Sequence, residues 1–116
     1  MKQIPVIYKK VDYHRYGRTV GGAFSKGVLI IEENSFLIKP VKWKILEYLK
    51  NNSSLEFDNN QHLNIYKNQF QEYKIKYSTY CWENEVTLKI DKKYHNIIDN
   101  LILQRYKNSK LNTNKN

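Results

Sequence analysis

The sequence predicts an α+β domain in which several strands precede one C-terminal helix. Residues 86–90 alternate between apolar and polar side chains, as a half-buried strand does. From Tyr94 to Tyr106, apolar residues recur at steps of three and four, which is the stripe of an amphipathic helix. The chain has 116 residues, of which 41% are hydrophobic and 14% aromatic, so it is expected to bury a single core.

The N-terminal part of the chain is predicted to hold one short strand and one irregular segment. Ile4–Tyr8 is apolar and β-prone, and Pro5 is confined to its edge or start because proline has no N–H to donate. Val11–Gly27 contains all four glycines of the chain, which marks its backbone for unusual conformations.

A hairpin is predicted next. Two apolar runs, Gly27–Ile31 and Phe36–Lys39, flank the polar four-residue turn Glu32–Ser35. Pro40 ends the second strand of this hairpin.

The segment Val41–Leu49 fits two structures. Its apolar residues alternate like those of a strand, yet they also fall on one face of a helix. The helix formers Lys, Leu and Glu and the following Asn51-Asn52 favour the helix. Asn51–Asn60 has the composition of a loop, with at most a short extended piece around Leu55 and Phe57.

The last third of the chain is predicted to contain strands and then the helix. Strands are expected within 62–66, 70–80 and 81–90. Asp91 is a suitable N-cap for the helix that follows. The polar residues 109–116 predict a disordered tail, which leaves 1–108 as the single domain.

The positive charge is concentrated at the two ends of the sequence. The net charge is +9, and residues 1–30 carry six basic residues against one acidic residue. Such ends attract nucleic acid, an anionic membrane surface or an acidic protein. Lysine outnumbers arginine 17 to 3, and Lys, Asn, Ile and Tyr together make 53 of the residues, so part of this charge reflects an AT-rich coding sequence.

Candidate binding residues lie in the basic N-terminal segment. Tyr13–Arg18 mixes aromatic rings, a histidine and two arginines, and glycines follow it at 21 and 22. Cations and backbone N–H groups bind phosphates, and aromatic rings stack on bases. The alternative is a turn between two strands whose charges only face water. The predicted site consists of Lys9, Lys10, His14, Arg15, Arg18 and Lys26.

No catalytic residue, metal site or cofactor is predicted. The three histidines, His14, His62 and His95, show no ligand spacing. Cys81, the one cysteine, cannot form an intramolecular disulfide and is expected at the start of a strand as a small buried hydrophobe. Trp43 and Trp82 are expected to be core residues or partner anchors.

The order of these elements resembles the bacterial PH-like and GRAM-like domains. Gly27–Pro40 is similar to their opening hairpin, Ile65–Ile75 to a later strand that turns into the next, and Cys81–Tyr106 to the last strand and helix. The resemblance implies a bent antiparallel sheet or partly open barrel whose open end is plugged by the helix. PH domains that bind phosphoinositides carry a basic loop between their first two strands, whereas Glu32–Ser35 is acidic.

We therefore expect a non-enzymatic interaction module that binds an anionic partner, a membrane surface or an acidic protein, through its basic N-terminal segment. The alternative is a small DNA- or RNA-binding protein that uses the same segment. The longest apolar run, Val28–Ile31, is far shorter than the roughly 20 residues of a membrane span. No secretory signal follows Met1, so the expected compartment is the cytoplasm. The sequence predicts no oligomeric state.

Overall fold

The computed structural model describes residues 2–41, 54–58 and 61–114 of the chain, with side chains up to Lys107. Its strands are β1 (Lys2–His14), β2 (Thr19–Gly21), β3 (Ser25–Ile31), β4 (Ser35–Pro40), β5 (Leu55–Asp58), β6 (Asn64–Lys67), β7 (Tyr73–Thr79) and β8 (Trp82–Lys89). Its helices are the single 3-10 turn η1 (Lys92–Tyr94) and the helix α2 (His95–Asn114).

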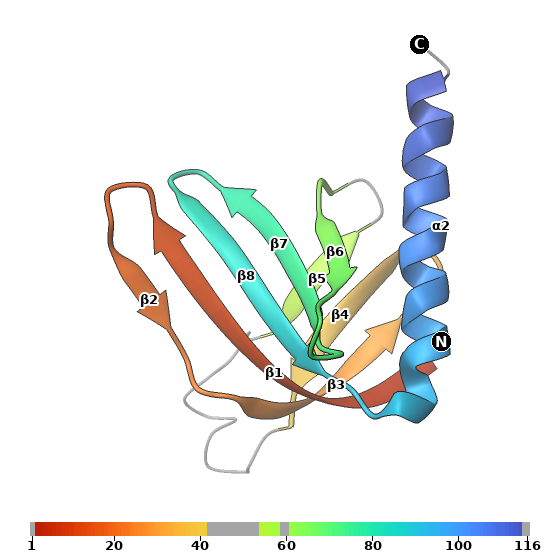
Figure 1. The fold of residues 1–116 in the computed structure, drawn as a ribbon, viewed down its shortest axis with the longest axis horizontal. Coiled ribbons are helices and arrows are strands. Elements are labelled where there is room, and N and C mark those ends of the chain that lie inside the picture. The colour runs from red at the N-terminus through yellow and green to blue at the C-terminus, as the bar shows by residue number, and fades with distance from the viewer. Residues whose placement is uncertain (1, 42–53, 59–60, 115–116) are drawn as a thin grey trace.

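The strands form one antiparallel sheet that curls into a half-barrel, and α2 lies at one end of it (Figure 1). The strand order is β5-β4-β3-β1-β8-β7-β6, and the short β2 pairs with β1 beyond the end of β3. The predicted α+β class, with a bent antiparallel sheet and a C-terminal helix, is therefore confirmed.

The strand β1 lies in the middle of the sheet and is paired on both edges. On one edge it pairs with β3 from Lys2 to Tyr8 and then with β2 from Val11 to Tyr13. On the other edge it pairs with β8 from Ile7 to His14. The prediction that the first strand ends at Tyr8 was wrong, because backbone partners on both edges hold the polar second half extended.

The glycine-marked segment is consequently mostly strand, and only residues 15–18 and 22–24 of it lie outside β1, β2 and β3. The predicted hairpin Gly27–Pro40 is confirmed as β3 and β4, with a turn of Glu32–Asn34. Two strands precede this hairpin, so Glu32–Ser35 does not join the first two strands of the fold. That connection is the turn Arg15–Arg18, which is basic.

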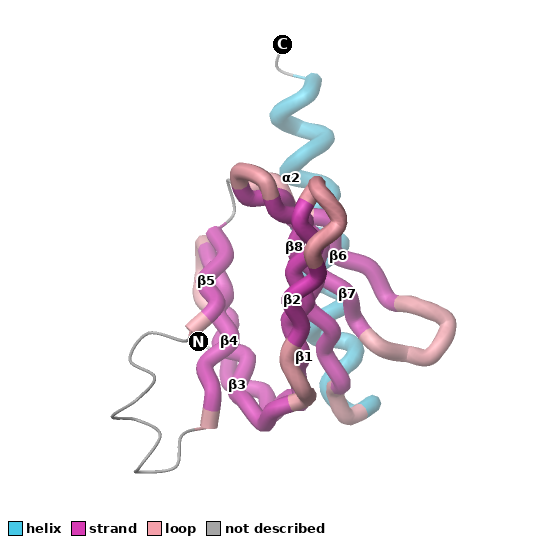
Figure 2. Tube along the Cα trace, turned by 90° about the vertical axis from the view of Figure 1, so that its left-hand side faces the viewer, coloured by secondary structure: helices cyan, strands magenta, loops and turns pink. Residues whose placement is uncertain are grey.

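The core lies between the two halves of the curled sheet. Figure 2 shows β3, β4 and β5 facing β1, β8 and β7 across the interior. We call the face of the sheet that carries Ile4 and Val6 the inner face and the opposite one the outer face. The buried apolar side chains are Ile4, Val6, Leu29, Phe36, Ile38, Phe57, Tyr73, Ile75, Val86, Leu88, Ile90 and Ile98.

Two predictions for the middle of the chain have different outcomes. Strands predicted within 62–66, 70–80 and 81–90 are found as β6, β7 and β8, and the short extended piece around Leu55 is β5. Residues 42–53, with Trp43 and most of the ambiguous segment Val41–Leu49, lie outside the described residues.

The helix α2 is anchored to the sheet by polar contacts as well as by its apolar stripe. Asp91 accepts a hydrogen bond from the Lys93 N–H at 3.3 Å, so the predicted N-cap is confirmed, although the turn it caps is η1. The Tyr73 hydroxyl donates to Asp99 Oδ1 at 2.7 Å. Further along, the Arg105 guanidinium donates to the carbonyl of Gln61 at 2.9 Å, which ties the helix to the chain after β5.

The C-terminal end of α2 lies further along the chain than the stripe Tyr94–Tyr106 predicts. The backbone is helical to Asn114, within the segment 109–116 that composition predicts to be a tail. The domain boundary at residue 108 stays a prediction.

We predict that Gly27→Ala destabilises the fold by about 1–3 kcal/mol through overpacking. An added Cβ would lie 2.7 Å from Tyr8 Cε1 and 3.0 Å from the backbone oxygen of Lys39. Gly21→Ala is the matched control, since its Cβ would meet Val11 Cγ2 at an ordinary 3.6 Å. Urea unfolding of both variants measures the difference, and equal midpoints would contradict this account of the packing at Gly27.

We also predict that the free energy of unfolding falls as the pH rises above about 10. Burial, together with the hydrogen bond to Asp99, raises the pKa of Tyr73, so the unfolded chain loses this proton at a lower pH than the folded chain. The loss approaches about 1.4 kcal/mol per pH unit for this one group. Tyr73→Phe loses the hydrogen bond to Asp99 and should therefore be less stable at pH 8. Because it also removes the titrating hydroxyl, its free energy of unfolding should fall less steeply with rising pH.

Chemical denaturation between pH 8 and pH 11 measures this slope. The control is Tyr80→Phe, since the Tyr80 side chain is 95% exposed and should affect neither stability nor slope. An unchanged slope in Tyr73→Phe would show that another group causes the alkaline loss.

Candidate anion-binding surface at two hairpin tips

The turns of two hairpins lie side by side at the end of the sheet that is farthest from α2 (Figure 1). The first is the β1–β2 hairpin with the turn Arg15–Arg18, and the second is the β7–β8 hairpin with the turn Tyr80-Cys81. Their strands pair as far as His14 and Trp82, and beyond this pair the Arg15 N–H donates to the Cys81 carbonyl at 3.1 Å. The tip surface, as we call it, comprises His14, Arg15, Tyr16, Arg18, Tyr80 and Trp82.

The backbone of the first turn is held by its own hydrogen bonds. The His14 N–H donates to the Arg18 carbonyl at 2.6 Å, and the Gly17 N–H donates to the His14 carbonyl at 3.0 Å. Gly17 has a φ of 95°, a conformation that costs glycine little and other residues more. The turn therefore holds the backbone of Arg18 beside that of His14, the residue before Arg15.

His14 packs at the base of the tip surface. Its ring lies 4.7 Å from the Trp82 ring in an edge-on arrangement and 5.3 Å from the Tyr16 ring. The Tyr16 N–H lies 3.3 Å from His14 Nδ1, which accepts this hydrogen bond. The half-buried His14 ring joins the two hairpins through its contact with Trp82. The rings of Tyr16 and Tyr80 face solvent.

The exposed rings come one from each hairpin. Tyr16 is 87% exposed and Tyr80 is 95% exposed. Neither side chain is used by the core, and each has an accessible aromatic face. Such faces stack on planar groups of a ligand.

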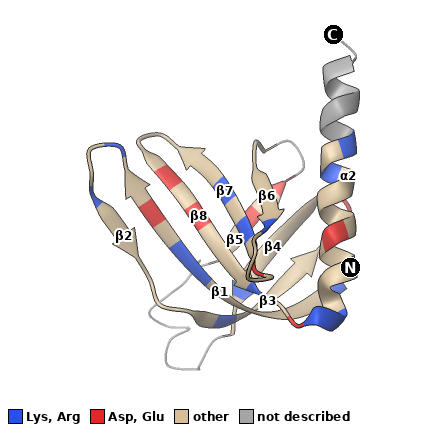
Figure 3. Ribbon diagram, in the orientation of Figure 1, with Lys and Arg blue, Asp and Glu red and all other residues tan. Residues whose placement is uncertain are grey.

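The two guanidinium groups of the tip surface have no acidic partner in the described part of the chain. Arg15 and Arg18 are exposed, and no side-chain hydrogen bond or ion pair is formed by either of them there. Figure 3 shows this turn in blue, with acidic residues further down β1 and β8. One of these, Glu85, is already paired with Lys74 at 3.1 Å and with Lys76 at 3.7 Å.

The six residues of the predicted site do not form one surface. His14, Arg15 and Arg18 belong to the tip surface. Lys9 lies opposite Thr87 on the outer face, whereas Lys10 lies on the inner face, 3.6 Å from Asp12. Neighbouring residues of a strand point to opposite faces, so Lys9 and Lys10 cannot act together.

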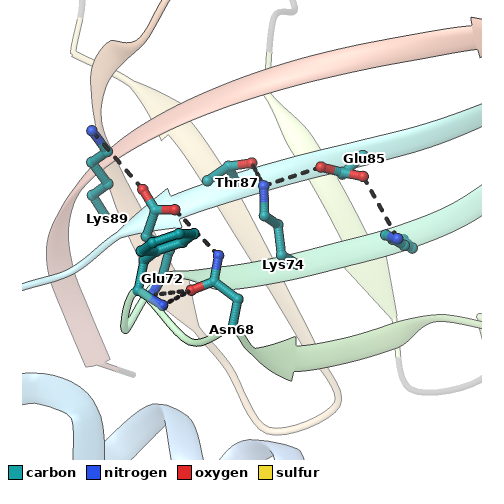
Figure 4. Close-up of polar contacts among 8 residues, drawn as sticks. Asn68, Glu72, Lys74, Glu85, Thr87 and Lys89 are labelled. Atoms are coloured by element: carbon teal, nitrogen blue, oxygen red, sulfur yellow. Dashed lines mark hydrogen bonds and ion pairs between the residues drawn. The ribbon is translucent and has the colours of Figure 1, made fainter.

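The outer-face lysines are partly engaged by other side chains. The Nζ atoms of Lys9 and Lys89 lie 4.8 Å and 4.2 Å from the centre of the Phe24 ring. Lys89 also lies 3.9 Å from Glu72, within the polar network drawn in Figure 4. Lys26 is exposed on the same face, opposite Ile7. Of these lysines, only Lys89 has an acidic partner in the described part of the chain, so Lys9 and Lys26 keep their positive charge.

Sequence analysis did not place Tyr80 in the site, named Tyr16 only as part of the segment Tyr13–Arg18, and expected Trp82 to be a core residue or a partner anchor. The turn Tyr80-Cys81 lacks the Asn-Gly or Gly-containing signal of a two-residue hairpin, and Tyr80 itself adopts a φ of 28°. The prediction that Cys81 is a buried residue at the start of a strand was wrong, because Cys81 lies in this turn and is half-buried. The alternation of residues 73–79 and 82–88 was the signal that could have located this turn.

Within the described residues, no group of three or more His, Cys, Asp or Glu side chains is arranged to hold a metal ion. No helix in this part of the chain is sufficiently long and apolar to span a membrane. Comparisons of the chain with protein-family models, curated proteins and solved structures found no significant match, so its function has to be inferred from its own residues.

Proposed function

We propose that this chain is a small interaction module that binds an anionic partner through the tip surface. The observation that supports this proposal is the pair of exposed guanidinium groups, Arg15 and Arg18, which have no acidic partner in the described part of the chain. Guanidinium groups bind carboxylates and phosphates with two parallel hydrogen bonds, and they are less strongly hydrated than lysine ammonium groups.

The charge of the whole chain supports the same proposal. The net charge of +9 attracts an anionic partner from a distance, and the tip surface then offers the short-range contacts. Lys9 and Lys26 would add attraction from the outer face, whereas Lys10 is compensated by Asp12. The proposed contact residues are therefore His14, Arg15 and Arg18, with the exposed tyrosines beside them.

A PH-like fold that acts in the cytoplasm without catalysis is part of this proposal. The curled sheet with α2 packed across its end supports the PH-like assignment. The basic turn Arg15–Arg18 between the first two strands is also what the resemblance implies for PH domains that bind anionic headgroups. The acidic turn Glu32–Ser35 therefore does not argue against binding of an anionic headgroup, since it does not join the first two strands.

We predict that the double variant Arg15→Gln/Arg18→Gln loses about tenfold in affinity per guanidinium for any polyanion that the protein binds. The probes are heparin, vesicles that contain phosphatidylserine, and a single-stranded oligonucleotide, each titrated at 50 mM and 150 mM salt. The variant should melt at the wild-type temperature, since neither side chain forms a hydrogen bond or ion pair with the described residues of the fold.

The matched control is Lys39→Gln/Lys92→Gln, which removes the same charge from exposed positions outside the tip surface. Equal losses in the two double variants would show that net charge alone drives binding. No binding to any of the probes would overturn the proposed function.

A further inference from the structure

We infer that the anionic partner of the tip surface is a single-stranded nucleic acid whose phosphates contact Arg15 and Arg18 and whose bases stack on Tyr16 and Tyr80. This inference rests on the proposed function and adds the class of partner. It depends on the aromatic rings, which binding to a simple polyanion would not use.

The aromatic rings favour a partner with accessible planar groups. Tyr16 and Tyr80 are among the most exposed large side chains of the described residues, and they come from hairpins that are hydrogen-bonded to each other through Arg15 and Cys81. Bases in a duplex stack on one another, so only unpaired bases can stack on protein rings in this way. The surface therefore favours a single strand over a duplex.

The order of side chains along the turn matches the chemistry of a single strand. Arg15 directly precedes Tyr16 and Arg18 follows it after Gly17, so cationic residues stand on both sides of an aromatic residue in the sequence of the turn. A single strand likewise presents phosphates on both sides of each base. Guanidinium groups bind phosphates in a bidentate manner, which would position the strand while the tyrosine stacks on a base.

The same residues are less suited to a membrane surface. Residues 13–19 and 79–82, which form the two tips, contain no aliphatic side chain of valine size or larger and no phenylalanine. Loops and helices that insert below the headgroups bury such side chains, whereas Tyr and Trp rings lie at the headgroup level. A membrane would therefore contact the charge and the rings of this surface at headgroup depth only, without an aliphatic anchor.

The acidic residues behind the tip surface limit the contact to a few nucleotides. Asp12, Glu83 and Glu85 lie on β1 and β8 directly below the two turns, and Glu83 forms no ion pair in the described part of the chain. Asp12 and Glu85 are paired with lysines, so the repulsion of phosphates there comes mainly from Glu83. Two phosphate contacts predict a slope of about −1.4 for the logarithm of affinity against the logarithm of salt concentration, because each contact contributes about −0.7 for a single strand.

The test is a fluorescence-anisotropy titration of the full chain with a labelled 12-nucleotide thymidine oligomer, at 50 to 200 mM salt. The same titration uses a duplex of equal length, and vesicles containing phosphatidylserine are assayed in parallel. We expect the single strand to bind at least tenfold more tightly than the duplex, with the salt slope given above.

Two pairs of variants separate stacking from charge. Tyr16→Ala/Tyr80→Ala should lose about tenfold or more in affinity for the oligomer and keep the wild-type salt slope. Arg15→Gln/Arg18→Gln should lose affinity and most of the slope. Phe70→Ala is the aromatic control, since Phe70 is 72% exposed in the β6–β7 turn, at the end of β7 away from the tip surface.

Equal affinity for single strand and duplex, or an unchanged affinity in Tyr16→Ala/Tyr80→Ala, would overturn the inference. If the arginine variant then still lost affinity for vesicles or heparin, the proposed function would stand with another partner. If no probe depended on Arg15 and Arg18, the proposed function would fail together with the inference. Melting curves of every variant show whether a loss comes from unfolding.

Discussion

The alternation of side chains along β1 determines where the core and the open end of this molecule lie. On its inner face, Ile4 and Val6 are buried in the core, whereas further along the same face the strand carries Lys10, Asp12 and His14. Because β1 is paired on both edges, a shift of one residue would move the apolar set to the outer face. One strand therefore builds the core at one end of the sheet and a polar surface at the other.

The helix α2 lies at the end of the sheet that holds the apolar half of β1, and it does not cover the polar half of β1. Its Ile98 side chain is buried in the core that contains Tyr73, and the hydrogen bond between Tyr73 and Asp99 fixes the position of the helix over the sheet. No helix of the described part of the chain covers the tip surface in this way. It is held by ladder hydrogen bonds between β1, β2, β7 and β8 and by the packing of His14 on Trp82. Side chains there can be exposed without loss to the core.

Most of the fold could be predicted because β3 and β4 are apolar runs on either side of a polar turn, and because the apolar residues of β8 and α2 recur periodically. The second half of β1 could not, since Lys9–His14 has no buried apolar face of its own and is extended only because partners lie on both edges. Half of the predicted site residues share one surface. Of the others, Lys9 and Lys26 lie on the outer face, whereas the alternation of strand residues puts Lys10 on the inner face.

The placement of the arginines argues that the tip surface is more than a by-product of composition. Lysine outnumbers arginine 17 to 3, which is what codon bias towards AT produces. One arginine, Arg105, donates to the backbone carbonyls of Asp58 and Gln61 and so has a structural role. The other two lie in one turn, on either side of an exposed tyrosine, with no structural contact for their guanidinium groups in the described part of the chain. An excess of lysine over the whole chain does not explain why both remaining arginines lie in this turn.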